Sequence, residues 1–150
     1  MGHAVTICEC FARDGLQHET VFVPTEEKVA LIESFVAAGF GRVEATSYSS
    51  PKHVPAFADA SDVLRRLRRR EGVWYKATCP NERAVSRAVE DLDQGFGANE
   101  LSLLVSATES HTERNLRTTR QEQWSRVASM VAAAGGRRPS SSRGSIGEAS

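Results

Sequence analysis

Hydrophobic residues change their spacing along this chain in a regular way. Short apolar runs rich in β-branched residues predict strands at residues 4–8, 42–46, 73–79 and 101–105. Each run is followed by a segment in which apolar residues recur every three or four positions, which predicts a helix. Parallel strands need a crossover between them, and a helix supplies it. Four strand-then-helix units therefore predict an α/β fold with a parallel sheet.

Polar residues and glycines mark the expected ends of these helices. Thr25 is a candidate cap for the first helix, which Gly39 ends, and Gly72 ends the second. Thr119 followed by Glu122 has the spacing of a capping box for the fourth helix. The expected apolar faces contain Val29, Ile32 and Val36; Val63, Leu64 and Leu67; Ala84, Val85, Ala88, Val89 and Leu92; and Trp124, Val127 and Val131.

Length and charge exclude several classes of protein. A chain of 150 residues fits one domain, which buries about 70% of the surface of its unfolded form. Nineteen basic and nineteen acidic residues cancel, so no global field attracts nucleic acid or an anionic membrane. No apolar run approaches the roughly 20 residues of a membrane span, and the amino terminus lacks the pattern of a signal peptide. We therefore expect a cytoplasmic protein with neither nucleic acid nor membrane as partner.

The three cysteines agree with a reducing compartment. Cys8, Cys10 and Cys79 form an odd, sparse set that fits neither a disulfide framework nor a zinc pattern. Cys8 and Cys10 are two positions apart on a predicted strand, so they share a face. We interpret them as buried structural thiols.

The composition changes after Ala134. The last sixteen residues, GGRRPSSSRGSIGEAS, are rich in Gly, Ser, Arg and Pro and contain one large apolar residue, Ile146. Such a segment lacks the apolar surface that a core requires. The sequence therefore predicts a folded domain at 1–134 and a disordered tail at 135–150.

Two further groups have ordinary structural interpretations. Trp74, Tyr75 and Trp124 are expected to be packing residues rather than a stacking platform. We expect the cluster of Arg65, Arg66, Arg68, Arg69 and Arg70 to form a solvent-exposed face of the protein, because acidic residues elsewhere balance its charge.

Polar residues gather where the predicted strands end. Arg13 and Asp14 follow the first strand, Glu44 lies in the second, and Asn81 follows the third. The carboxyl ends of parallel strands share one rim, where functional groups collect. Glu44 lies within an apolar run, and a buried carboxylate is costly unless it is paired.

Several motifs carry a resemblance to a known family. They are Arg13-Asp-Gly-Leu-Gln17, Val43-Glu-Ala-Thr-Ser47, Ser50-Pro-Lys52 with Val54-Pro55, Pro80-Asn81, and Ser106 to Glu109 with Asn115. Together, and in this order, the motifs resemble hydroxymethylglutaryl-CoA lyase, one of the metal-dependent TIM-barrel lyases and synthases. The resemblance runs through about residues 4–134. It implies the first four βα units of an incomplete TIM (β/α)8 barrel.

The resemblance also implies a reaction and a set of site residues. The expected reaction is the metal-dependent cleavage of 3-hydroxy-3-methylglutaryl-CoA to acetyl-CoA and acetoacetate, with an acyl-CoA as partner. By analogy, Asp14 binds Mg²⁺ or Mn²⁺, and Arg13 polarises the thioester carbonyl and stabilises the enolate. Glu44 supports this network, and Gln17 contacts the substrate or the groups around the metal. Glu44 then has Arg13 as its natural partner.

Other parts of the family's site are absent from the sequence. The family adds a His-x-His pair, an asparagine and a mobile cysteine, whereas no two of His3, His18, His53 and His111 are separated by a single residue. A complete barrel takes about 250 residues. We therefore expect weak metal binding and little turnover from the isolated chain.

Two alternatives to an active lyase stay open. In the first, the chain is a catalytically silent half-barrel, as a truncated or frameshifted product or a binding remnant would be. In the second, it is a related condensing enzyme of the isopropylmalate or homocitrate synthase type. Half a barrel also leaves strand edges and apolar side chains uncovered, so we expect self-association through the open sheet edges.

Overall fold

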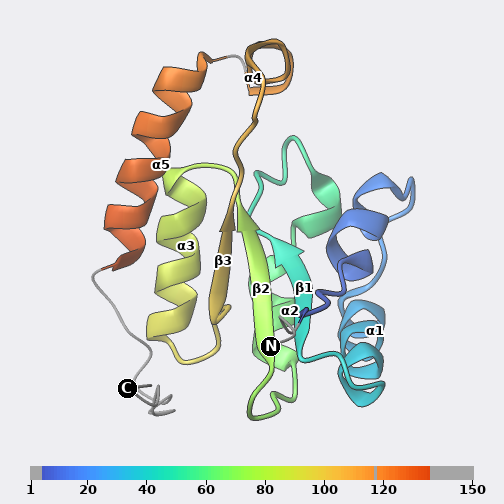
Figure 1. Ribbon diagram of the computed structural model, residues 1–150. Coiled ribbons are helices and arrows are strands. Elements are labelled where there is room, and N and C mark those ends of the chain that lie inside the picture. Colours follow the sequence, from blue (N-terminus) through green and yellow to red (C-terminus); the bar gives the residue numbers. More distant parts are fainter. Residues whose placement is uncertain (1–4, 117, 136–150) are drawn as a thin grey trace.

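The computed structural model describes residues 5–116 and 118–135, which form a parallel sheet flanked by helices (Figure 1). The strands are β1 (Arg42–Ser47), β2 (Trp74–Cys79) and β3 (Glu100–Leu103), in the order β1-β2-β3. The helices are α1 (Thr25–Ala37), α2 (Ala60–Arg66), α3 (Glu82–Asp93), α4 (Glu109–Leu116) and α5 (Arg120–Gly135). The α/β class predicted from the sequence is confirmed.

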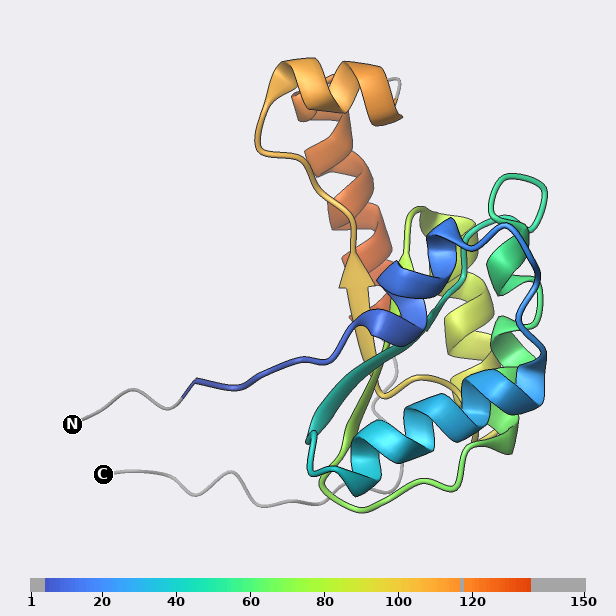
Figure 2. The ribbon, with the colours of Figure 1, turned by 90° about the vertical axis from the view of Figure 1, so that its right-hand side faces the viewer.

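The helices are arranged by their order in the chain. α1 and α2 lie toward β1, whereas α3 and α5 lie toward β3 (Figure 1). The side view shows α4 and the first turns of α5 projecting beyond the carboxyl end of β3 (Figure 2). The sequence pattern did not predict α4, whose eight residues are mostly polar.

The strands pair in a register that brings polar residues together. Arg42 lies opposite Trp74 and Glu44 opposite Lys76. The register shifts between Glu44 and Thr46, which marks a β-bulge. Glu44 consequently faces Lys76 near the middle of the sheet, at the foot of the site described below.

The predicted first strand at residues 4–8 is wrong for the part that the structure describes. Residues 5–8 lie outside any strand, and Val5 and Ile7 are 86% and 68% exposed. Pairing begins one residue later, where Glu9 forms a single parallel bridge with Val43. A β-branched run forms a strand only where a neighbouring backbone is available, and β1 starts level with Glu9.

Two predicted helix boundaries are also corrected. Thr25 does not cap α1 but is its first residue, and its hydroxyl donates a hydrogen bond to Asp59 Oδ2 at 2.7 Å. α2 ends at Arg66, well before Gly72, because the chain turns to an extended conformation at Leu67. The end of α1 at Gly39 is as predicted, with φ of 102°.

Side-chain caps define the starts of α3 and α5. Asn81 Oδ1 accepts a hydrogen bond from the amide of Ala84 at 3.0 Å. Thr119 Oγ1 accepts from the Glu122 amide, and Glu122 Oε2 accepts from the Thr119 amide, each at 3.2 Å. This reciprocal pair confirms the predicted capping box.

The core lies between the sheet and helices α1, α2 and α3. Its largest buried side chains are Tyr48, Tyr75, Phe57, Ile32, Leu64, Val43, Val63 and Val85. The hydroxyl of Tyr48 donates to Asp91 Oδ2 at 2.6 Å, which ties the segment after β1 to α3. Burial, followed by the Asp91 carboxylate, raises the pKa of Tyr48, so its hydroxyl stays a donor.

A buried lysine fixes the loops around α1. Lys28 is 3% exposed and donates to Ala56 O at 2.6 Å and to Asp59 Oδ1 at 2.7 Å. Its ammonium also lies 4.0 Å from the centre of the Phe22 ring. Both the segment before α1 and the segment before α2 are therefore held by one side chain.

Aromatic residues divide into buried and exposed groups. Tyr75 is buried as predicted, whereas Trp74 and Trp124 are about half exposed, so their predicted packing role is wrong for the described structure. Val131 on α5 is exposed too; Met130 is the buried apolar side chain of that helix. The arginine cluster is solvated as predicted, and Asp62, Glu26 and Glu33 pair with three of its members.

Two findings bear on the ends and on membranes. No helix within residues 5–116 and 118–135 is long and apolar enough to cross a membrane. The predicted tail begins at the last residue of α5, Gly135, and its remaining residues, 136–150, lie outside the described residues.

Gly97, in the loop between α3 and β3, provides a test of how this loop packs against the end of α3. A Cβ added there lies 2.3 Å from Leu92 N and 2.8 Å from Asp91 C, both backbone atoms that cannot yield without moving the end of α3. We expect Gly97→Ala to lower the free energy of unfolding by about 1–3 kcal/mol in urea denaturation. Gly41→Ala is the control, because nothing lies within 4 Å of its added Cβ. Equal stability of the two variants would contradict this account of the packing.

Candidate active site

One turn of π-helix, Phe11–Gly15, positions the predicted charged pair. The amides of Arg13 and Asp14 both donate to Cys10 O, at 3.1 and 2.7 Å. The ring of Phe11 lies directly over Gly15, where an added Cβ would be 2.5 Å from Phe11 Cδ2. Any larger residue at position 15 would therefore have to displace the Phe11 ring from this position. Single π-helical turns are frequent at functional sites.

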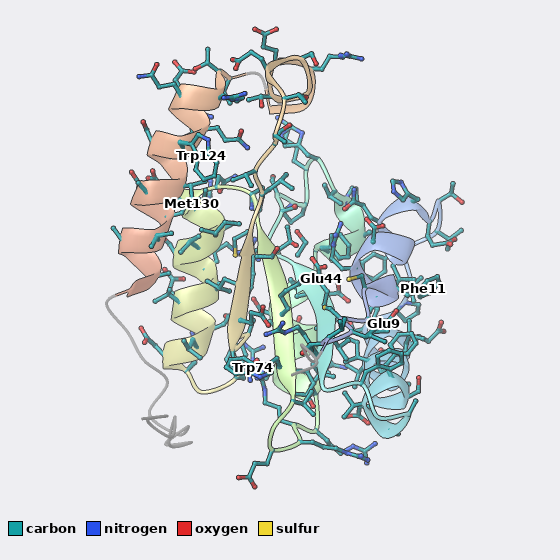
Figure 3. The ribbon with its side chains drawn as sticks, in the orientation of Figure 1. Glu9, Phe11, Glu44, Trp74, Trp124 and Met130 are labelled. Atoms are coloured by element: carbon teal, nitrogen blue, oxygen red, sulfur yellow. The ribbon has the colours of Figure 1, made fainter. Side chains whose placement is uncertain are left out.

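Arg13 is anchored by a carboxylate on the neighbouring strand. Arg13 Nε donates to Glu44 Oε1 at 2.8 Å, and a second guanidinium nitrogen lies 3.5 Å from Glu44 Oε2. Glu44 is 2% exposed, and Figure 3 places it on β1, across from Phe11 on the amino-terminal segment. A buried carboxylate with a two-point guanidinium contact fixes the orientation of the arginine.

Two residues of β2 complete the surroundings of Glu44. The Thr78 hydroxyl donates to Glu44 Oε1, and Lys76 Nζ lies 3.4 Å from Glu44 Oε2. Burial alone would raise the pKa of Glu44, but the hydrogen bonds from Thr78 and Arg13 and the nearby positive charges outweigh it. The pKa of Glu44 therefore lies below its ordinary value, and the carboxylate is ionised at neutral pH.

Asp14 lies at the outer side of this network. Its Oδ1 accepts a hydrogen bond from Arg13 at 2.9 Å, and its side chain is 64% exposed. Asp14 can therefore offer a carboxylate oxygen to a cation. No three of the His, Cys, Asp and Glu side chains in the described part of the chain are grouped as metal ligands. Within the described residues, Asp14 therefore has no second and third metal-ligating side chain beside it, and its role as a metal ligand stays a prediction.

Gln17 lies apart from these charges. It is exposed and lines a groove of about 360 Å³ with Phe22, His53 and Val54 among its neighbours. Its side chain makes no hydrogen bond to any other described residue. The structure thus brings Arg13, Asp14 and Glu44 together and leaves Gln17 in a separate groove, so its contact with substrate stays a prediction.

The paired thiols differ from their predicted burial. Cys8 and Cys10 share a face, with their sulfur atoms 3.9 Å apart, but both are partly exposed. Burial, together with Cys8 and Glu44 beside it, raises the pKa of Cys10 to about 12. The Cys10 thiol is consequently protonated at neutral pH and a poor nucleophile. Cys79 is fully buried, and burial raises its pKa to about 12.

Sequence reasoning missed Lys76 and Thr78. The signal was present, because these polar residues occupy alternate positions of an otherwise apolar strand and so share the face that Glu44 meets. Among the polar residues that follow β3, Glu109 has a structural role. Its carboxylate accepts a hydrogen bond from the Arg120 amide and so joins α4 to α5.

Known proteins match this chain over most of its length. The HMGL-like family matches residues 4–145. Hydroxymethylglutaryl-CoA lyase YngG of Bacillus subtilis is 39% identical over 118 residues, which cover 79% of this chain and 38% of that protein. The mitochondrial hydroxymethylglutaryl-CoA lyase of Rattus norvegicus is 38% identical over 130 residues, covering 87% of this chain and 38% of the relative.

Solved structures agree with these relatives. An HMG-CoA lyase from Brucella melitensis superposes with a TM-score of 0.81 at 38% identity. The match covers 90% of this chain and 46% of the Brucella chain. An HMG-CoA lyase from Acinetobacter baumannii, in complex with coenzyme A and 3-methylmalate, gives a TM-score of 0.79 at 35% identity. This match covers 88% of this chain and 42% of the Acinetobacter chain. This chain spans less than half the length of these proteins. Its parallel sheet and helices match part of the lyase TIM barrel, and the chain belongs to the HMGL-like family.

Proposed function

We propose that this chain carries the amino-terminal part of a hydroxymethylglutaryl-CoA lyase active site. The observation that carries the proposal is the guanidinium of Arg13, which buried Glu44 holds beside Asp14. The names of the relatives supply the reaction. The coenzyme A in the neighbouring structure supports an acyl-CoA as substrate.

Arg13 suits the charge that develops in this cleavage. The hydroxyl at C3 loses a proton, the bond between C2 and C3 breaks, and its electron pair moves onto the thioester as an enolate. Protonation at C2 then gives acetyl-CoA, and the other fragment is acetoacetate. A guanidinium has five N–H donors, of which Glu44 and Asp14 engage three. The two remaining donors are available to the enolate oxygen, whose hydrogen bonds strengthen as its charge grows.

Glu44 is a positioning residue in this proposal. It is buried, ionised and bound by Arg13, Thr78 and Lys76, so its position is fixed before substrate binds. A preorganised donor needs no rearrangement when charge appears on the substrate. Loss of the Glu44 charge would leave Arg13 free to rotate.

Asp14 would hold a divalent metal ion, with the remaining ligands supplied from outside the described residues. The HMGL-like family is typically metal-dependent, and an exposed carboxylate suits Mg²⁺ or Mn²⁺. When bound, such an ion acts as a Lewis acid toward substrate oxygens. Because one carboxylate does not complete a coordination shell, we propose that the 150-residue chain alone turns over little substrate.

The relatives favour cleavage over condensation. Those quoted above are named lyases, which supports a lyase rather than an isopropylmalate or homocitrate synthase. A catalytically silent half-barrel is the remaining alternative. Turnover measured after the missing part of the site is supplied separates the two, because a silent half-barrel predicts none.

A chimaera tests the proposed role of Arg13. Residues 5–135 would replace the matching segment of the Bacillus subtilis relative, so that its own carboxyl-terminal part completes the site. We expect metal-dependent release of acetoacetate from 3-hydroxy-3-methylglutaryl-CoA, and a fall in kcat of about 10²–10³-fold for Arg13→Gln, since an enolate donor is lost. The measurement is an enzyme-coupled acetoacetate assay.

The control for that experiment is Arg126→Gln, an exposed arginine on α5 far along the chain from the site. It should leave kcat unchanged. The unsubstituted 150-residue chain should release no acetoacetate above background. A folded but inactive chimaera, or an Arg13→Gln chimaera as active as its parent, would disprove the proposal.

We also propose self-association through the open edge beyond β3. Leu104 and Val105 follow that strand and are 48% and 44% exposed. Trp124 and Val131, on the α5 helix that comes later in the chain, are exposed as well. An uncovered parallel edge with apolar residues favours pairing with another chain.

Light scattering after gel filtration tests this association. We expect a mass above the 16.4 kDa of one chain that falls toward it when Leu104 and Val105 are both changed to Lys. Gln94→Lys, which adds one charge at an exposed site after α3, is the control and should not alter the mass. A monomer at every concentration tested would reject the proposal.

A further inference from the structure

A cavity of about 300 Å³ lies beside the carboxyl end of the sheet, between the segment after β1 and the first turns of α3. Its polar lining consists of Tyr48, Ser50, Asn81, Arg83 and Arg87. Neither the family match nor the network around Arg13 accounts for this group of side chains.

Two arginines on one face of α3 dominate the charge of the cavity. Arg83 and Arg87 are four residues apart, so their side chains are neighbours on the helix surface, and like charges at that spacing repel. Within the described residues, neither guanidinium pairs with a carboxylate. The arginines near α2 differ, because Asp62, Glu26 and Glu33 neutralise Arg65, Arg66 and Arg68.

The remaining lining groups are donors or are already satisfied. The guanidinium of Arg87 lies 5.4 Å from the centre of the Tyr48 ring. The Tyr48 hydroxyl already donates its hydrogen bond to Asp91. Asn81 Oδ1 accepts the Ala84 amide, which leaves its NH₂ group to donate. The Ser50 hydroxyl adds another donor. The cavity therefore combines two positive charges with neutral donors.

We propose that this cavity binds a phosphate group of the acyl-CoA substrate through Arg83 and Arg87. Guanidinium groups bind phosphate oxygens in pairs, and two of them balance a doubly charged phosphate. Assigning the phosphate to the nucleotide part of coenzyme A rests on the proposed function. The chemistry recognised is the phosphate itself, whether it belongs to that nucleotide or to a free phosphate compound.

The cavity is close enough to the Arg13 network to serve one substrate. Thr78, which binds Glu44, and Asn81, which lines the cavity, are three residues apart at the end of β2. Such a segment spans at most about 11 Å when extended. One ligand can thus reach both places along the same rim.

Calorimetric titration of the whole 150-residue chain tests this site without requiring turnover. The ligands are coenzyme A, adenosine 3′,5′-bisphosphate, inorganic phosphate and phosphate-free pantetheine. We expect Arg83→Gln and Arg87→Gln each to weaken binding of coenzyme A and the bisphosphate by about tenfold, as for lost charge-assisted hydrogen bonds. Pantetheine should show no dependence on either arginine. Arg126→Gln, exposed on α5, is the matched control and should bind like the unsubstituted chain.

Each outcome decides the proposal. Loss of coenzyme A and bisphosphate binding assigns the cavity to the substrate's nucleotide. Loss of inorganic phosphate binding alone, with coenzyme A unaffected, upholds a phosphate site but assigns it to a free phosphate compound. The proposal is overturned if each of the four ligands binds the double Arg83→Gln, Arg87→Gln variant as tightly as it binds the unsubstituted chain. Arg13→Gln should retain the arginine-dependent binding, so failure of the lyase proposal and failure of this one are distinguishable.

Discussion

The buried carboxylate of Glu44 is the constraint around which the site is organised. An ionised group that is 2% exposed would destabilise the sheet unless positive groups and donors surrounded it. Arg13 comes from the amino-terminal π-helical turn, whereas Lys76 and Thr78 come from β2. Glu44 therefore joins three segments that are distant in sequence. The same contacts orient the guanidinium that we assign to the reaction.

The elements that the sequence predicted well are those with strong local signals. Glycine with positive φ after α1 and the capping box of α5 depend on neighbouring residues, and each is present in the structure. β2 also follows from its own composition. The predicted strand at residues 4–8 was wrong for residues 5–8, because strand formation depends on a partner backbone. The local sequence does not report where that partner ends.

The site could be predicted only in part, for related reasons. Arg13, Asp14 and Glu44 were identified from motifs and from the cost of a charge within an apolar strand, and they lie together. Lys76 and Thr78 were missed because their role depends on the register of β1 against β2. Lys28 was missed although it lies four and eight residues before Ile32 and Val36 on the buried face of α1, where a lysine is expected only if its charge is paired.

The central claim is that Arg13 and Glu44 act as one unit, and a double-mutant cycle measures this most directly. Urea unfolding at pH 7 of the parent chain, Arg13→Gln, Glu44→Gln and the double variant gives the coupling free energy of the pair. The account predicts a coupling of about 1.5–3 kcal/mol, as expected for hydrogen bonds to charged groups. Additive effects, with a coupling below about 0.5 kcal/mol, would show that the two residues are merely neighbours and would contradict the account.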